Sequence, residues 1–209
     1  SGSLTPARAV TLAHDNGEGL EFRRTIKVDE NYLFTIEDSV ANKGSAPVSL
    51  FPDALISRHG RPATLGYYIL HEGLVGVMGD QGLQEIGYGD IESKKTISFK
   101  VTNAWLGITD KYWAGTLLPS PKANVQARFS SNLVGTLRTY QTDYLLDPLT
   151  VAIGGTATTT TNLFAGAKEV RLLDHYRDQL GIPLFDRGVD FGWLWFLTKP
   201  IFAVLHWLN

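Results

Sequence analysis

The sequence predicts a mainly β domain of stacked antiparallel sheets, with helical segments only toward its carboxyl end. Apolar and polar residues alternate in many short runs, which is typical of strands with one buried face. The 21 glycines and nine prolines mostly fall between those runs, where turns are needed. A clear helical repeat of apolar residues begins only after residue 166. About ten strands with short connections favour sheets that pack face to face.

The clearest strands form a predicted hairpin. Residues 20–28 and 32–40 both alternate, and residues 29–31, Asp-Glu-Asn, favour a turn between them. Another strand is expected over residues 48–56, bent near Pro52 because proline cannot donate to a strand ladder. Further strands are expected at residues 65–70, 74–78, 95–101, 111–118, 123–130, 132–141 and 157–163.

One amphipathic helix follows the strands. Residues 167–180 place apolar side chains on one face and charged side chains on the other. Gly181 suits the position just after the last turn, and Pro183 prevents the helix from continuing. Residues 181–190 are then expected to form a linker.

Composition excludes several classes of protein. The chain has 209 residues, 44% hydrophobic and 19% charged, so it can bury a full core as one large domain. Its net charge is −2 and its basic residues are scattered, which argues against a nucleic-acid partner. The absence of cysteine excludes disulfides, thiolate metal sites and a cysteine nucleophile, although it does not fix the compartment.

Enzyme motifs are hard to find. The chain has no HExxH, P-loop or GxSxG motif, and the glycines of residues 73–82 lack the spacing of a phosphate-binding loop. His71 and Glu72 are adjacent, but neighbours on a strand point to opposite faces. Asp186 and Asp190 lie where a solvated linker is expected. We therefore expect no catalytic residue, no metal site and no cofactor.

An aromatic cluster occurs in the middle of the chain. Trp105, Tyr112 and Trp113 lie near Asp110 and Lys111, a mixture that could line a ligand groove. Large aromatic residues in a β-sandwich more often fill the core or the space between sheets. Both interpretations stay open on the sequence alone.

The last twenty residues, 190–209, are strongly apolar and hold three of the five tryptophans. Tryptophan concentrates where water meets lipid. A spanning helix is disfavoured, because Lys199 at the centre of the run costs about 2.5 to 3.5 kcal/mol. Pro200 suits the first turn of a helix with one apolar face, which we expect to lie in the membrane interface. The alternative is that this helix packs on the core of its own domain.

Several motifs resemble the periplasmic domain of the YidC family of bacterial inner-membrane protein insertases. The similarity covers residues 4–209 and includes VDENYLFTIEDSVANKG, LFPDALISRHGRP, WLGITDKYW and LFAGAKEVRLLDHY. The version here resembles the alphaproteobacterial branch. The most specific motif, D-x-G-W-x-x-F-x-x-x-P, is formed by Asp190, Gly192, Trp193, Phe196 and Pro200.

The resemblance implies an antiparallel β-supersandwich of galactose mutarotase type with carboxyl-terminal helices. Residues 1–3 look like an expression-vector remnant, and residues 4–165 are expected to form the sandwich. Residues 166–182 would be an amphipathic helix packed on it. Residues 183–209 would be a linker and an interfacial helix leading to a transmembrane region.

The resemblance also implies a non-catalytic module on the periplasmic side of the bacterial inner membrane, which supports insertion and folding of membrane proteins. The implied partners are Sec translocon subunits (SecF and relatives), nascent membrane proteins and the membrane surface, and the isolated domain is expected to self-associate. The functional segment at the membrane interface is expected to comprise Asp190, Gly192, Trp193, Trp195, Phe196, Pro200, Phe202 and Trp207.

An alternative function follows from fold analogy alone. A mutarotase-like fold would also suit a carbohydrate-binding or aldose-epimerase-like domain. An epimerase needs a general acid and a general base that converge on one sugar ring. The sequence offers only arbitrary candidates for such a pair, namely His71 with Glu72, or His59 with Glu85.

Overall fold

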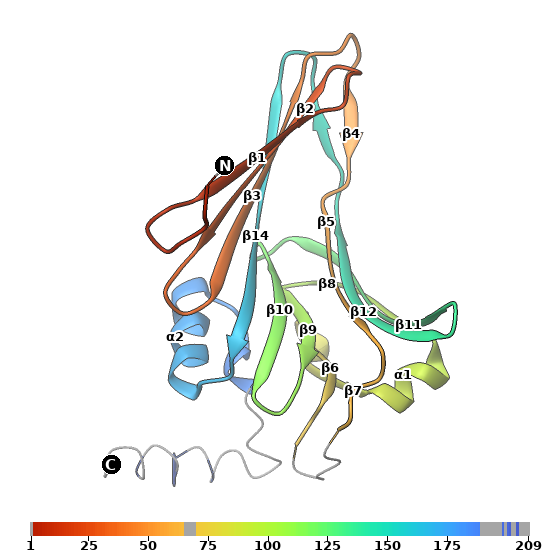
Figure 1. The fold of residues 1–209 in the computed structure, drawn as a ribbon, viewed down its shortest axis with the longest axis vertical. Coiled ribbons are helices and arrows are strands. Elements are labelled where there is room, and N and C mark those ends of the chain that lie inside the picture. Colours follow the sequence, from red (N-terminus) through yellow and green to blue (C-terminus); the bar gives the residue numbers. More distant parts are fainter. Residues whose placement is uncertain (1, 65–69, 189–197, 199, 202–203, 205–209) are drawn as a thin grey trace.

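The computed structural model describes residues 2–64, 70–188, 198, 200, 201 and 204. Its main feature is a twisted antiparallel sheet of eight strands that runs the length of the molecule (Figure 1). In spatial order these strands are β1 (Val10–Asp15), β2 (Leu20–Val28), β3 (Leu33–Asn42), β14 (Thr156–Ala167), β10 (Trp113–Pro119), β9 (Ala104–Thr109), β6 (Gly73–Met78) and β7 (Leu83–Gly87).

A second sheet of four strands covers one face of the first. Its order is β5 (Asp53–His59), β12 (Leu137–Leu146), β11 (Asn124–Val134) and β8 (Thr96–Thr102), all antiparallel. A small two-stranded sheet pairs β13 (Leu149–Val151) with β4 (Val48–Leu50). Within residues 2–64 and 70–188 the helical elements are η1 (Gly79–Gln81), α1 (Tyr88–Lys94), α2 (Val170–Leu180) and η2 (Phe185–Gly188). The mainly β, antiparallel fold predicted from the sequence is therefore confirmed.

The predicted amino-terminal hairpin is confirmed. β2 has the predicted bounds, and it pairs antiparallel with β3 from Leu20 opposite Asn42 to Val28 opposite Phe34. The Asp29 carboxylate accepts the backbone N–H groups of Asn31 and Leu33, which fixes the turn.

At Pro52, where a bend within one strand is predicted, the chain instead passes from one sheet to another. Residues 48–56 form two strands instead of one, because β4 ends at Leu50 and β5 begins at Asp53 in the four-stranded sheet. The Pro52 carbonyl accepts the N–H of Leu146 at 2.9 Å, so the crossing point is itself held by a backbone hydrogen bond.

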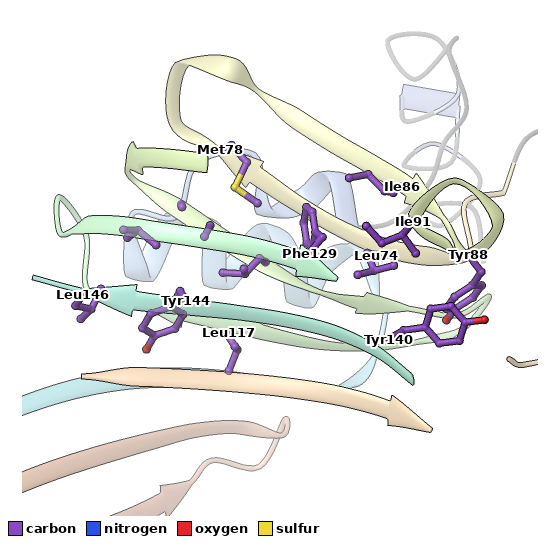
Figure 2. Packing of buried hydrophobic residues seen from close by; sticks show 14 residues of the cluster. Leu74, Met78, Ile86, Tyr88, Ile91, Leu117, Phe129, Tyr140, Tyr144 and Leu146 are labelled. Carbon is purple, nitrogen blue, oxygen red and sulfur yellow. The ribbon is translucent and has the colours of Figure 1, made fainter. Parts of the chain in front are cut away.

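The main core fills the space between the two large sheets. Figure 2 shows Leu74 and Met78 from β6 facing Phe129 from β11 and the tyrosines of β12. Tyr144 crosses this layer, and its hydroxyl lies 2.6 Å from the Thr161 hydroxyl on β14. Burial of apolar side chains between the sheets and this hydrogen bond together hold the sandwich closed.

A second core lies where α2 and η2 pack on the eight-stranded sheet. Every residue of β6 and β9 is buried, because these two strands have one face toward each core. The second cluster consists of Leu33, Val75, Val77, Trp105, Leu118, Phe164, Leu173, Tyr176, Ile182 and Phe185. The lower half of the molecule therefore has three layers, as Figure 1 shows.

Helix α2 begins at Val170, three residues later than predicted, because β14 continues to Ala167. Gly181 ends the helix as predicted: its φ of 64° and ψ of 33° are left-handed, and its N–H donates to the Arg177 carbonyl. Within the described residues, no helix has both the length and the apolar composition needed to cross a membrane.

Several boundaries differ from the predictions. The expected strand 132–141 is wrong: β11 continues to Val134, and β12 begins at Leu137 after a turn. Strand 65–70 lies almost entirely outside the described residues. Four strands, β1, β7, β9 and β13, and the short helix α1 were not predicted as such.

Candidate functional site

The predicted interface segment lies mostly outside the described residues. Of its members only Pro200 is described, and it is exposed and helical. Its described neighbours Ile201 and Val204 are 50% and 56% exposed. The structure does describe how the chain leaves the sandwich toward this segment, through residues 182–188, which we call the carboxyl-terminal joint.

Trp105 is the centre of the joint. Its side chain is completely buried on β9, and its indole N–H donates to the Pro183 carbonyl over 2.9 Å. The Phe185 ring packs edge-to-face on the indole, with the ring centroids 5.4 Å apart. Such aromatic pairs add about 0.5 to 1.5 kcal/mol to the free energy gained from burial. The joint is therefore built into the core.

The aromatic contacts continue into the sheet and the helix. Phe185 also meets Phe164 of β14 at 5.9 Å, and Phe164 meets Tyr176 of α2 at 6.1 Å. The Tyr176 hydroxyl donates to the Asp29 carboxylate. Burial and this hydrogen bond raise the pKa of Tyr176 well above its ordinary value. The joint, α2 and the β2–β3 turn are thus one packed unit.

An ion cluster holds the outer side of the joint. The Arg177 guanidinium contacts Asp174 at 2.9 Å, Asp178 at 2.8 Å and Asp186 at 3.5 Å. The expectation that Asp186 is solvated is wrong, because it is only 8% exposed and faces this guanidinium. The hydrogen bond to Asp178 and the neighbouring carboxylates raise the pKa of Arg177, so its charge persists at all ordinary pH values.

The three aromatic residues of the central cluster do not share one groove. Trp105 lies in the core, whereas Tyr112 and Trp113 are 63% and 60% exposed at the β9–β10 turn. Trp113 borders a shallow depression of about 360 Å³ with Ile56 and Arg58. The groove hypothesis is therefore wrong for Trp105, which fills the core as the alternative interpretation holds.

An open groove lies in the upper half of the molecule. It has a volume of about 420 Å³ and separates β1, β2, β3 and β14 from the chain around Pro52. Its lining combines apolar side chains, including exposed Leu12 and Phe51, with the Arg24–Asp38 ion pair. The groove therefore has both apolar and charged lining residues.

The residues considered for catalysis take structural positions. The His71 Nε2 lies 2.9 Å from the Leu74 carbonyl oxygen, a contact within the β6 region. His59 ends β5 and Glu85 lies on β7, so the two belong to different sheets. Among the described residues, no three histidine or acidic side chains are grouped so that they could hold a metal ion.

Sequence reasoning missed the joint because it assigned residues 181–190 to a linker. One signal was present: Ile182, Leu184 and Phe185 are apolar, which is unusual for a solvated linker after a helix stop. Ile182 and Phe185 are buried, whereas Leu184 is 41% exposed. The partner of Phe185, Trp105, is distant in sequence, so only the fold could bring the two together.

The fold and the joint define a class of protein, a β-sandwich scaffold with a structurally anchored carboxyl-terminal extension. The particular family follows from comparison: the model of the YidC periplasmic domain matches residues 1–204. The chain belongs to this family, as its motifs predicted.

Curated relatives agree with this assignment. A membrane protein insertase YidC from Nitrobacter hamburgensis is 58% identical over 98% of this chain and 35% of its own length. The protein of the same name from Bradyrhizobium diazoefficiens is 59% identical over 98% of this chain and 34% of its own length. The chain thus spans about a third of the curated relatives that it matches. Both relatives are named as membrane protein insertases.

The similarity to solved structures is low. The Slr1438 protein from Synechocystis matches 76% of this chain and 61% of its own at 11% identity, with a TM-score of 0.48. A protein of Escherichia coli K12 provisionally assigned as an aldose 1-epimerase matches 76% and 65% at 10% identity, with a TM-score of 0.37.

Proposed function

We propose that this chain is the periplasmic module of an inner-membrane protein insertase and acts as a rigid, non-catalytic scaffold at the membrane. The carboxyl-terminal segment holds the module on the periplasmic side of the inner membrane. In that position it supports the insertion and folding of membrane proteins by meeting Sec translocon subunits, such as SecF and its relatives, or nascent segments.

The carboxyl-terminal joint is the observation that carries this proposal. Trp105 and Phe185 lock the exit of the chain into the second core, and Arg177 ties Asp186 to α2. A flexible linker would let the domain tumble relative to a neighbouring membrane segment. A packed joint instead fixes the position at which the chain leaves the sandwich, which favours a scaffold over an independently tethered binding domain.

The open groove supplies a candidate surface for partners. β1 is the last strand of the eight-stranded sheet, and Leu12 and His14 on it line the groove. An edge strand beside an apolar groove can accept an extended segment through backbone hydrogen bonds and side-chain pockets. The 53% exposed ring of Phe51 gives such a segment an aromatic contact.

Photocrosslinking in the full-length insertase tests the proposal. A photoreactive amino acid replaces Phe51 in the groove, Pro200 in the tail or, as the control, Leu133, which is 59% exposed on the β11–β12 hairpin. We expect Sec subunits or arrested nascent chains to crosslink at Phe51 and Pro200 and not at Leu133. The same products at all three positions, or none at Phe51 and Pro200, would overturn the partner assignment.

A further inference from the structure

The turn between β9 and β10 presents two large aromatic side chains to solvent. Tyr112 is 63% exposed and Trp113 is 60% exposed. Each buries an area of roughly 150 to 250 Å² when it is covered, so this exposure forgoes a large stabilisation. Exposed aromatic residues that gather at one place on a surface mark an interaction site.

The turn is held in a fixed conformation. The Arg58 guanidinium of β5 binds the Asp110 carboxylate in a bidentate pair, with Nη2 and Oδ2 at 2.6 Å. The backbone N–H of Lys168 donates to the Tyr112 carbonyl at 2.8 Å, and the Lys168 ammonium donates to the Thr109 hydroxyl at 2.9 Å. Arg58 on β5 and Lys168, which directly follows β14, therefore brace the turn, so its aromatic residues lose little conformational entropy on binding.

The turn lies at the end of the molecule from which the chain leaves the sandwich. Trp113 pairs with Ala167, just before α2, and Gly73 at the start of β6 pairs with Thr109. In Figure 1 the β9–β10 hairpin reaches the lower end of the molecule, and the blue segment after α2 descends to the same end. The turn thus lies at the same end of the sandwich as the carboxyl-terminal joint.

The chemistry of the turn matches the headgroup region of a bilayer. The Lys111 ammonium lies 4.8 Å from the centroid of the Tyr112 ring. Indole and phenol rings prefer the boundary between water and hydrocarbon, and a lysine stem packs along an apolar surface while its ammonium stays with phosphates. A tyrosine, a tryptophan and a lysine on one braced turn favour a lipid surface over a protein pocket.

We propose that the turn formed by Lys111, Tyr112 and Trp113 is a second membrane contact, which inserts its rings among phospholipid headgroups. With the tail as the first contact, the turn fixes how the sandwich is rotated on the bilayer. This inference rests on the proposed membrane location of the module. The experiment below distinguishes a failure of the turn contact from a failure of the membrane location.

The absence of native cysteine allows each region to carry one unique label. We would place cysteine with a bimane fluorophore at Tyr112, at Val204 in the tail, or at Ile153, which is 59% exposed in the β13–β14 connection. The 209-residue chain is mixed with phosphatidylethanolamine–phosphatidylglycerol vesicles that carry a nitroxide near the headgroups. We expect the nitroxide to quench the labels at residues 112 and 204 and to leave the label at 153 unchanged.

The other outcomes are distinct. Quenching at 204 without quenching at 112 removes the turn contact and keeps the tail contact, whereas quenching at neither position removes both. A third outcome is that the label at residue 112 is shielded from lipid while the particle mass grows with protein concentration. That result would mean that the turn contacts a second copy of the chain, and it would overturn the proposal.

A second variant tests the contribution of the indole. Trp113→Ala is expected to weaken vesicle binding roughly tenfold, because about half of an aromatic surface loses its lipid contact. Ile153→Ala is the matched control and should bind as the unchanged chain does. Equal affinities for all three chains would contradict the proposal, and circular dichroism confirms that each variant folds.

Discussion

Trp105 joins two parts of the molecule that are far apart in sequence. Its ring fills the second core, and its N–H satisfies the Pro183 carbonyl at the start of the joint. A hydrogen bond of this kind contributes about 0.5 to 1.5 kcal/mol, so the side chain contributes both apolar burial and a specific polar contact. It thereby fixes where the chain leaves the sandwich.

Two substitutions of Trp105 should therefore destabilise the protein to different extents. Trp105→Phe keeps a ring but loses the hydrogen bond, and it should lower the free energy of unfolding by about 1 to 3 kcal/mol. Trp105→Ala also leaves a cavity and should cost about 3 to 5 kcal/mol. Urea unfolding measures both. Trp113→Phe is the exposed control and should change the value by less than about 0.5 kcal/mol; an equal loss at both positions would refute the assignment.

Buried tyrosines make stability sensitive to alkaline pH. Burial between the sheets raises the pKa of Tyr144 to about 12, against the opposing effect of its hydrogen bond with Thr161. An unfolded tyrosine titrates near pH 10, so the unfolded chain loses this proton first. The contribution is fully present below about pH 10 and declines as the pH rises toward 12.

The Tyr144→Phe variant tests this linkage. Because phenylalanine cannot ionise, the variant should lose less stability than the unchanged chain between about pH 10 and pH 12. Urea midpoints across that interval give the comparison, and Tyr112→Phe is the exposed control. Parallel pH profiles for Tyr144→Phe and the unchanged chain would show that Tyr144 isn't responsible.

At the scale of elements, the central strands pack with little room to spare. A Cβ at Gly107 on β9 would lie 2.1 Å from the Gly115 carbonyl oxygen and 2.8 Å from the Thr116 Cα. These are backbone atoms of β10, so only a shift of the strand could relieve the overlap. Gly115, opposite Ile108, has space: its nearest neighbour is the end of the Ile56 side chain at 3.6 Å.

These two glycines form a matched pair for mutation. Gly107→Ala should lower the free energy of unfolding by at least about 2 kcal/mol, because overpacking a rigid ladder forces the backbone to move. Gly115→Ala should change it by less than about 1 kcal/mol. Thermal or urea unfolding measures the stability of both variants. Equal stability of the two alanine variants would contradict the close approach of β9 and β10.

The elements that could be predicted from sequence are those with one solvated face. β8 alternates because only one of its faces is covered, and Gly181 marks the end of α2 by its conformation. β9 has no alternation, since it is buried on both faces, and it was read as an aromatic cluster. α1 is seven residues long, too short for a helical repeat to be evident.

The candidate site was less predictable than the fold. The apolar, aromatic carboxyl-terminal segment stood out in composition, but the joint depends on which strand β9 lies beside and which face Trp105 occupies. Neither follows from local sequence, because strand order in a sheet is a property of the whole chain. Tyr112 and Trp105 are seven residues apart in the sequence, yet Tyr112 is exposed and Trp105 is buried.

At the scale of the whole molecule, the sandwich has the carboxyl-terminal joint in one half and the open groove in the other. The second core holds the joint, and the groove and the β1 edge lie in the other half of the molecule. A membrane at the exit would hold the groove away from the bilayer, within reach of neighbouring periplasmic surfaces. Self-association of the isolated domain stays a prediction, to be measured by sedimentation.

Vesicle flotation tests the central claim, that the segment after the joint holds the sandwich on the membrane. The shortened chain should end at Gly188, because Ile182 and Phe185 belong to the second core and the Pro183 carbonyl accepts the Trp105 hydrogen bond, so removing them would damage the fold. We expect the 209-residue chain to float with phosphatidylethanolamine–phosphatidylglycerol vesicles and the shortened chain to remain largely at the bottom of the gradient. Equal flotation of the two chains, or no flotation of the longer one, would contradict the account.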